Sequence, residues 1–200
     1  MTSETLQIRD EILLAVLPNV AFDGWNWDSV CACAQEAGHS KNTVRAVFPE
    51  GLVSVLDHFS DWADREMLER LHGINIEDMR IRDRIRTALI TRFEVLNSYK
   101  EAVRQSLQFW FWPTRKIRAA KITWRLADCI WIWAGDTATD YNRYTKRTLL
   151  SGVIASTTLA WLNDPDDDMH KTKAFLDSRI ENVMQLGKVI NTIKSKKAGA

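Results

Sequence analysis

The sequence predicts an all-α protein, and two observations carry that prediction. Apolar residues recur almost throughout the 200 residues at the three- and four-residue spacing of a helix that is buried on one side. Proline and glycine, which interrupt helices, are rare, with four and eight copies. A chain of this length forms one large domain or two small ones and is long enough to bury a core. We therefore expect about eight or nine helices.

Residues 1–50 are typical of a helix-turn-helix. A first helix is predicted over residues 6–20. Asp28 is expected to cap a short second helix that ends at Gly38, and Ser40 to cap a third that Pro49 ends. Two helices joined by a turn that contains glycine form a pattern shared by many DNA-binding proteins.

The rest of the chain is predicted to be helical as well. The expected helices span residues 52–72, 79–96, 99–112, 114–134 and 140–162, and a last long helix follows Asp168, its expected cap. No internal repeat, glycine-rich phosphate loop or low-complexity segment accompanies them.

The charges are distributed unevenly. Residues 1–60 hold three bases and eight acids, a net charge of −5, whereas residues 80–125 hold twelve bases and three acids, a net charge of +9. A DNA-reading helix would present Ser40, Lys41, Asn42, Thr43 and Arg45 to the major groove. Non-specific DNA affinity comes mainly from basic side chains that neutralise phosphates. A helix-turn-helix in a region with a net charge of −5 therefore gains little affinity for DNA in this way. We expect a helix-turn-helix kept as a scaffold, and no DNA binding.

Neither a metal site nor a catalytic site is indicated. Cys31, Cys33 and His39 are a partial zinc set on a helix whose apolar face would bury the cysteines, and no fourth ligand is evident. No arrangement for nucleophilic or acid–base catalysis stands out. We expect a non-enzymatic protein without metal or cofactor. The N-terminus has no apolar signal segment and no apolar run reaches the length of a bilayer span, so a reducing cytoplasm is the expected location.

Tryptophan is abundant, with nine copies, of which six lie between residues 110 and 161. The stretch from Gln108 to Pro113 is apolar all around a helix, as expected at the mouth of a lipid pocket or at a membrane contact. Dense packing in a helical core explains the same aromatics, and both interpretations stay open. The candidate lipid-binding residues are Phe109, Trp110, Phe111, Trp112, Trp124, Ile130, Trp133 and Leu159.

The helix over residues 140–162 has two different sides. Asp140, Arg143, Tyr144, Arg147 and Ser151 share one side, which we expect to face solvent and a partner protein. The opposite side, which runs from Tyr141 through Gly152 to Leu159, is apolar and small, and we expect another helix to pack on it. A helix cap at Thr139 or Asp140 with ion pairs along the helix is the simpler alternative for the charged side.

Two segments of the chain resemble the lipid-binding accessory proteins of ubiquinone biosynthesis, the family of the ninth Coq protein, whose fold is TetR-like. The resemblance covers about residues 125–187. The matching residues are Trp131, Ala134, Gly135, Asp136, Thr139, Asp140, Asn142, Tyr144, Thr145 and Arg147, followed by Phe175, Leu176, Arg179 and Gly187.

The resemblance implies a TetR-like helical protein with three parts. A degenerate helix-turn-helix region occupies residues 1–50, a helical lipid-binding and dimerisation domain residues 51–187, and a basic tail residues 188–200. It implies a homodimer, with the face ending at Trp161 as a candidate, that is peripheral to the inner membrane. A TetR-type repressor with a hydrophobic ligand is the alternative.

In the family that the chain resembles, the C-terminal helices enclose a lipid. The implied ligand is an isoprenoid, a quinone precursor or a phospholipid, which is presented to the di-iron hydroxylase of the pathway. The implied partner-binding residues are Trp131, Asp140, Asn142, Tyr144 and Arg147. Arg143 departs from the family pattern, which commonly has an aromatic residue there. The lysine-rich tail is short and offers little apolar insertion, so the basic region, with Trp110 and Trp112 as anchors, is expected to assist membrane docking.

Overall fold

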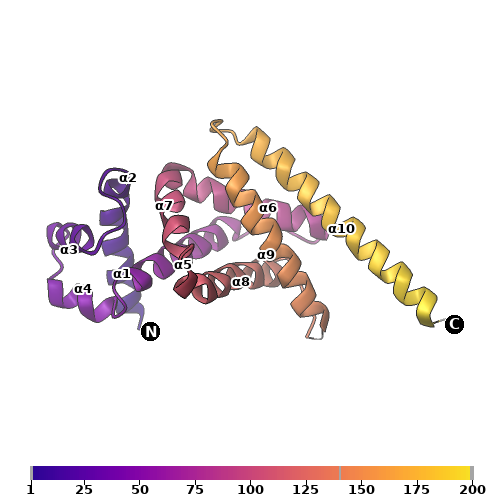
Figure 1. The fold of residues 1–200 in the computed structure, drawn as a ribbon, viewed down its shortest axis with the longest axis horizontal. Helices are drawn as coiled ribbons and strands as arrows, with labels where there is room; N and C mark the ends of the chain where they lie inside the picture. Colours follow the sequence, from indigo (N-terminus) through magenta and orange to yellow (C-terminus); the bar gives the residue numbers. More distant parts are fainter. Residues whose placement is uncertain (1, 140, 199–200) are drawn as a thin grey trace. The chain divides into compact units, whose positions relative to one another are not determined.

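The all-α prediction is confirmed by the computed structural model, which describes residues 2–139 and 141–198, with side chains as far as Gln185. Ten α-helices and three short 3-10 helices cover these residues, and no strand occurs among them (Figure 1). In chain order they are α1 (Ser3–Val16), η1 (Leu17–Asn19), α2 (Val20–Asp23), α3 (Trp27–Glu36), α4 (Lys41–Val47), α5 (Leu52–Leu71), α6 (Ile81–Leu96), η2 (Asn97–Tyr99), α7 (Lys100–Trp110), η3 (Pro113–Arg115), α8 (Lys116–Trp133), α9 (Tyr141–Leu162) and α10 (His170–Ala198).

The extra helix arises at the N-terminus. Pro18 lies in the first turn of η1 and divides the segment predicted as one helix into α1, η1 and α2. Proline lacks the N–H that would continue the α-helical hydrogen-bond ladder, which accounts for the break.

The expected helix-turn-helix is present as α3 and α4. The Ser40 cap is confirmed, because Ser40 Oγ accepts a hydrogen bond of 3.1 Å from the backbone N–H of Thr43. The Asp28 cap is wrong: Asn26 Oδ1 accepts from the backbone N–H of Ser29 at 2.7 Å, and α3 begins at Trp27. Both residue types cap helices well, and the tertiary fold selects the earlier one. Gly38, with φ of +88°, supplies the turn that joins the two helices.

The chain divides into two compact units, which we call unit 1 and unit 2. Unit 1 contains the residues up to Arg70 together with Glu94–Ile122, and unit 2 contains Leu71–Phe93 together with the residues from Thr123 onward. This division cuts across the expected boundary at residue 50, because most of α5 lies in unit 1 with the N-terminal helices.

Polar contacts join α1 to α5 within unit 1. Asp10 accepts two hydrogen bonds from the Arg65 guanidinium, at 2.9 and 2.6 Å, and lies 2.8 Å from Nε2 of the buried His58. Burial lowers the pKa of His58 below its ordinary value, although Asp10 opposes that shift. Arg118, at the start of α8, donates to Asp57 of α5 at 2.9 Å. Ion pairs therefore tie α1 and the start of α8 to α5.

Unit 2 is built on α9 and α10, which pack together, and α10 returns alongside α9 (Figure 1). Trp161 is fully buried and stacks on Phe93 with the ring centroids 5.2 Å apart. The expectation that the dimer face ends at Trp161 is therefore wrong for the side chain itself, because the core of unit 2 encloses it.

The start of α10 differs from the expected cap at Asp168. Asp164 accepts hydrogen bonds of 2.8 Å from the backbone N–H and the hydroxyl of Thr172, and Asp166 accepts one of 3.3 Å from the backbone N–H of His170. The run of aspartates offers several equivalent acceptors, so the sequence alone selects the wrong one. The side chains of the basic tail lie outside the described residues, and its docking role stays a prediction.

Candidate functional site

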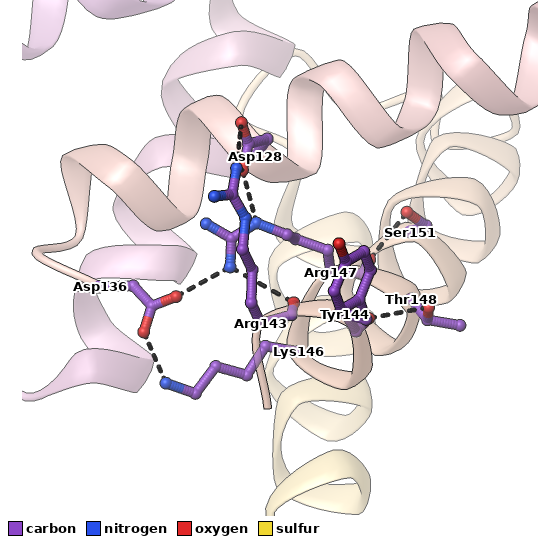
Figure 2. A network of polar contacts seen from close by, with 8 residues as sticks. All are labelled: Asp128, Asp136, Arg143, Tyr144, Lys146, Arg147, Thr148 and Ser151. Atoms are coloured by element: carbon purple, nitrogen blue, oxygen red, sulfur yellow. Dashed lines mark hydrogen bonds and ion pairs between the residues drawn. The ribbon is translucent and has the colours of Figure 1, made fainter. Parts of the chain in front are cut away.

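A network of charged side chains holds the turn between α8 and α9 (Figure 2). The Arg147 guanidinium on α9 donates to Asp128 on α8 at 2.5 Å and to Asp136 in the turn at 2.8 Å. Lys146 donates to the second oxygen of Asp136 at 2.5 Å, and Arg143 donates to Asp128 at 3.2 Å. Two carboxylates and three bases thus connect both helices and the turn through charge-assisted hydrogen bonds.

The backbone of the turn explains Gly135 and Asp136, two of the residues that match the family of ubiquinone accessory proteins and that we call the signature residues. Gly135 has φ of +86°, the left-handed conformation that ends many helices, and the backbone N–H of Asp136 donates to the carbonyl of Trp131 at 2.9 Å. Arg84 on α6 donates to the carbonyl of Ala134 at 2.8 Å, where α8 leaves backbone acceptors unpaired. A side chain at position 135 would be strained by its backbone and would meet Arg84 Nη1 at 3.1 Å.

Burial makes this network strong and costly to disturb. Arg147 is only 2% exposed and Asp136 only 5%. Burial acts to raise the pKa of Asp136, but its hydrogen bonds to Lys146 and Arg147 prevail and hold that pKa below the ordinary value. Burial likewise acts to lower the pKa of Arg147, and the hydrogen bonds to Asp136 and Asp128 raise it. Both groups therefore stay charged at neutral pH, each compensating the other.

The two sides expected for α9 are found only in part: Tyr144 is exposed as expected, but Arg147 is not. Arg147 was expected beside solvent and is among the largest fully buried side chains, with Leu150, Val153, Ile154 and Thr157 on the same buried face. The small, apolar side, expected to be covered by another helix, is mostly exposed at Tyr141, Thr148, Gly152 and Leu159. Ion pairs with Asp128 and Asp136 make the charged Arg147 part of the buried face, which helical spacing alone does not reveal.

The predicted partner-binding residues separate into buried and exposed groups. Tyr144 is 61% exposed and its ring lies 6.1 Å from that of Trp124, centroid to centroid, and Asn142, two residues earlier on α9, is exposed as well. Trp131 is half-buried under the ammonium of Lys146, and its indole N–H is buried without a hydrogen-bond acceptor among the described residues. Arg147 lies beneath them, and Asp140 lies outside the described residues. Tyr144 and Asn142 are therefore the exposed members of the predicted partner-binding set, and the half-buried Trp124 lies against Tyr144.

The predicted lipid-binding residues are divided between the two units. Phe109, Trp110, Phe111 and Trp112 lie in unit 1, whereas Trp124, Ile130, Trp133 and Leu159 lie in unit 2. Ile130 and Trp110 are buried, Trp124 and Trp133 are half-buried, and Phe111, Trp112 and Leu159 are exposed. The burial of Trp110 removes it as a surface anchor, because its ring packs edge-on against Phe109.

A cleft of about 370 Å³ lies between α6 and α10 within unit 2. Its lining residues are Arg82, Asp83, Arg86, Asp177, Ile180 and Glu181, so it is mostly charged and includes none of the predicted lipid-binding residues. Among the described residues, no helix combines the length and apolar character that crossing a bilayer requires.

Two residues that hold the site were not singled out from the sequence. Asp128 accepts from both Arg143 and Arg147, and Lys146 covers Trp131. The sequence does contain a signal for Asp128. It is an acid on the tryptophan-bearing side of α8, and the next helix carries two arginines, Arg143 and Arg147, that can pair with it. Cys31 and Cys33 are buried in α3, where Cys33 Sγ lies 3.2 Å from Asn19 Nδ2, while Nε2 of His39 lies 3.0 Å from Glu11.

Comparison with known proteins finds a matching family model and several relatives of this chain. Residues 117–187 match the family model of COQ9. The chain is 29% identical over 195 residues to the mitochondrial ubiquinone biosynthesis protein COQ9 of Rattus norvegicus, which covers 94% of this chain and 62% of that protein. It is 27% identical over 195 residues to the Homo sapiens protein of the same name, covering 94% of this chain and 61% of that protein. The chain therefore spans less than two thirds of the length of these relatives.

The fold has a solved counterpart. A TetR transcriptional regulator from Nitrosomonas europaea superposes with a TM-score of 0.71 at 18% identity, covering 88% of this chain and 97% of that chain. At this identity the similarity concerns the fold alone. The fold is thus TetR-like, and the similarity to the COQ9 proteins expected from the signature segment is confirmed and extends over 94% of the chain.

Proposed function

We propose that this chain is a lipid-binding accessory protein of ubiquinone biosynthesis that presents a quinone precursor to the di-iron hydroxylase of that pathway at the inner membrane. The observation that carries the proposal is the similarity to COQ9 proteins over 94% of the chain, together with the signature residues Asp136 and Arg147 meeting in one network. The protein acts without catalysis of its own. The bound molecule is an isoprenoid, a quinone precursor or a phospholipid.

The exposed part of the signature supports a partner surface. Tyr144 exposes its ring beside the half-buried Trp124, and Arg143 on the same helix is held by Asp128. Aromatic residues and arginine are enriched at the centres of protein interfaces.

The lipid is tested by native mass spectrometry followed by denaturation and solvent extraction of the purified protein. We expect a mass excess that disappears on denaturation and an extract that contains an isoprenoid, a quinone intermediate or a phospholipid. A bare chain mass, with nothing extracted above a matched control protein from the same cells, would contradict lipid binding.

The partner surface is tested by pulling down the pathway hydroxylase with two variants of α9. Tyr144→Ala removes the exposed ring that contacts Trp124, whereas Tyr141→Ala removes an exposed ring one turn away. Loss of a hot-spot tyrosine weakens binding by about 30-fold, equivalent to about 2 kcal/mol. Equal retention of the hydroxylase by the two variants contradicts this surface.

A homodimer is part of the proposal, with the exposed face of α9 as its contact. This face carries Thr148, Gly152, Ala155 and Leu159, whose small side chains permit close approach of a second helix. Sedimentation equilibrium of the wild type and of Gly152→Glu tests it. We expect a dimer for the wild type and a monomer for the variant, since a charge on this face opposes burial.

A repressor is the alternative, and the helix-turn-helix geometry of α3 and α4 favours it. Ser40, Lys41, Asn42 and Arg45 are exposed and Thr43 is half-buried. The net charge of −5 over residues 1–60 weighs against it, because phosphate contacts supply most of the affinity for DNA. A gel-shift assay with DNA from the chain's own operon tests it, and a retarded band that Arg45→Ala abolishes would favour the repressor.

A further inference from the structure

The turn between α7 and α8, which lies entirely in unit 1, exposes large apolar side chains. Phe111 is 81% exposed, Trp112 66% and Ile117 75%, and Leu107 one turn earlier is exposed as well. We call these four residues the turn patch. Exposed apolar clusters of this kind on a folded protein mark a contact with another molecule or a membrane.

The backbone holds the turn patch in place. The N–H of Phe111 donates to the carbonyl of Leu107 at 3.0 Å, and the N–H of Arg115 donates to the carbonyl of Trp112 at 2.9 Å. Arg115 lies over the ring of Phe109, 3.6 Å from its centroid, and donates to its carbonyl at 3.1 Å. The rings of Phe111 and Trp112 are thus exposed by an ordered turn, whereas the preceding Trp110 is buried.

Cationic side chains lie on the same segment as the patch. Between Glu101 and Asp128 the sequence holds six bases and no acid. Arg118 is neutralised by Asp57 and Glu50, whereas Lys116 and Lys121 are exposed. The ammonium of Lys116 lies 5.8 Å from the centroid of the Phe111 ring, so charge and apolar surface meet at the same place.

We propose that the turn patch docks the protein on an anionic lipid bilayer, with Phe111, Trp112 and Ile117 entering the interface and Lys116 and Lys121 at the headgroups. Tryptophan prefers the interface between headgroups and acyl chains, and lysines near the surface are attracted to anionic lipid. A second copy meeting this patch about a two-fold axis would bring like charges together. Single-stranded nucleic acid would use the rings and lysines but gain little from Ile117 and Leu107, because stacking needs aromatic planes.

This inference deepens the proposed function, since it names the surface through which a lipid carrier would meet the membrane. The test is flotation of the full chain with vesicles of phosphatidylcholine alone and with 30% phosphatidylglycerol, about the anionic range that attracts basic segments. We expect binding to the anionic vesicles that weakens as salt rises. The basic tail is retained in every variant, so differences report the turn patch.

Three variants decide the outcome. Phe111→Ser with Trp112→Ser removes both rings and is expected to weaken vesicle binding about tenfold. Lys116→Gln with Lys121→Gln is expected to weaken it about fivefold for each base. Phe22→Ser is the matched control, because Phe22 is an even more exposed ring in unit 1 and lies beside an acid, Asp23. The control variant is expected to bind as the wild type does.

Undiminished binding by the ring variant, or an equal loss in the Phe22→Ser control, overturns the proposal. The proposal is also overturned if the ring variant still binds vesicles but no longer binds single-stranded DNA or no longer self-associates, because the patch would then serve one of those partners. The lipid extract separates the two proposals. A ring variant that loses vesicles but keeps its co-purified lipid leaves both standing, and a wild type that binds vesicles without co-purified lipid removes the proposed function alone.

Discussion

Two helix–helix turns of this protein differ in what they bury and what they expose. The turn between α8 and α9 buries charge: Arg147 and Asp136 are almost inaccessible to solvent and bind each other at 2.8 Å. The turn between α7 and α8 exposes apolar surface at Phe111 and Trp112. The buried ion pair of Arg147 and Asp136 thus stabilises the fold, whereas the aromatic side chains of Phe111 and Trp112 are exposed to solvent. The difference shows that residue type alone does not distinguish a structural turn from a contact surface.

The largest expected effect separates two arginines that share one carboxylate. Arg147→Ala leaves the buried Asp136 with Lys146 alone and removes the buried partner of Asp128, and should lower the free energy of unfolding by about 3–5 kcal/mol. Arg143→Ala removes a partly exposed ion pair to the same Asp128 and should cost less than about 1 kcal/mol. Urea unfolding of both variants measures the difference. Similar losses would mean that burial does not distinguish the two arginines.

The second effect compares two isoleucines of α8. Ile130 is fully buried and Ile132 is exposed. Ile130→Ala should lower the free energy of unfolding by about 2–5 kcal/mol, because it opens a cavity in the core of unit 2. Ile132→Ala should change it by about 0.5 kcal/mol or less. Thermal and urea unfolding check both values, and a small loss for Ile130→Ala would instead place that side chain in a space that a ligand fills.

The third effect depends on pH through Asp136. Although burial opposes it, the hydrogen bonds to Lys146 and Arg147 lower the folded-state pKa of Asp136, so its charge stabilises the fold above about pH 3.9, the unfolded value. That contribution is lost as the pH falls below 3.9 through the folded-state pKa. The difference in unfolding free energy between wild type and Asp136→Asn should therefore be constant from pH 7 to 5 and shrink below pH 4. A difference that grows on acidification contradicts the assignment.

The smallest expected effect belongs to the exposed turn. Phe111→Ser and Trp112→Ser should each leave the free energy of unfolding within about 0.5 kcal/mol of the wild type, since neither ring is buried. Urea unfolding in the absence of vesicles measures this. A loss as large as that of Ile130→Ala would show that the rings pack on a surface of the protein in solution.

Helical periodicity predicted most of the fold. The limits of α5, α8 and α9 were placed within two or three residues, and Ser40 was identified as a cap. Local pattern did not distinguish Asn26 from Asp28, because either side chain satisfies the first turn.

The site was harder to predict, because its burial depends on contacts distant in sequence. Arg147 looks like a surface residue until Asp128, 19 positions earlier, is brought to its guanidinium. Trp110 and Trp112 are two residues apart with the same apolar character, yet one is buried and the other exposed, because α7 ends between them. The exposed Ile117 was not singled out, since it lies on α8 beyond the aromatic run.

The contrast between the two turns is tested most directly by hydrogen exchange of the full chain with and without anionic vesicles. Amides of residues 107–121 should gain protection when vesicles are present, whereas those of residues 128–147 should exchange at the same rate in both conditions. Protection gained over residues 128–147, with none over 107–121, would contradict the account. It would make the signature turn, and not the exposed aromatic turn, the surface that meets lipid.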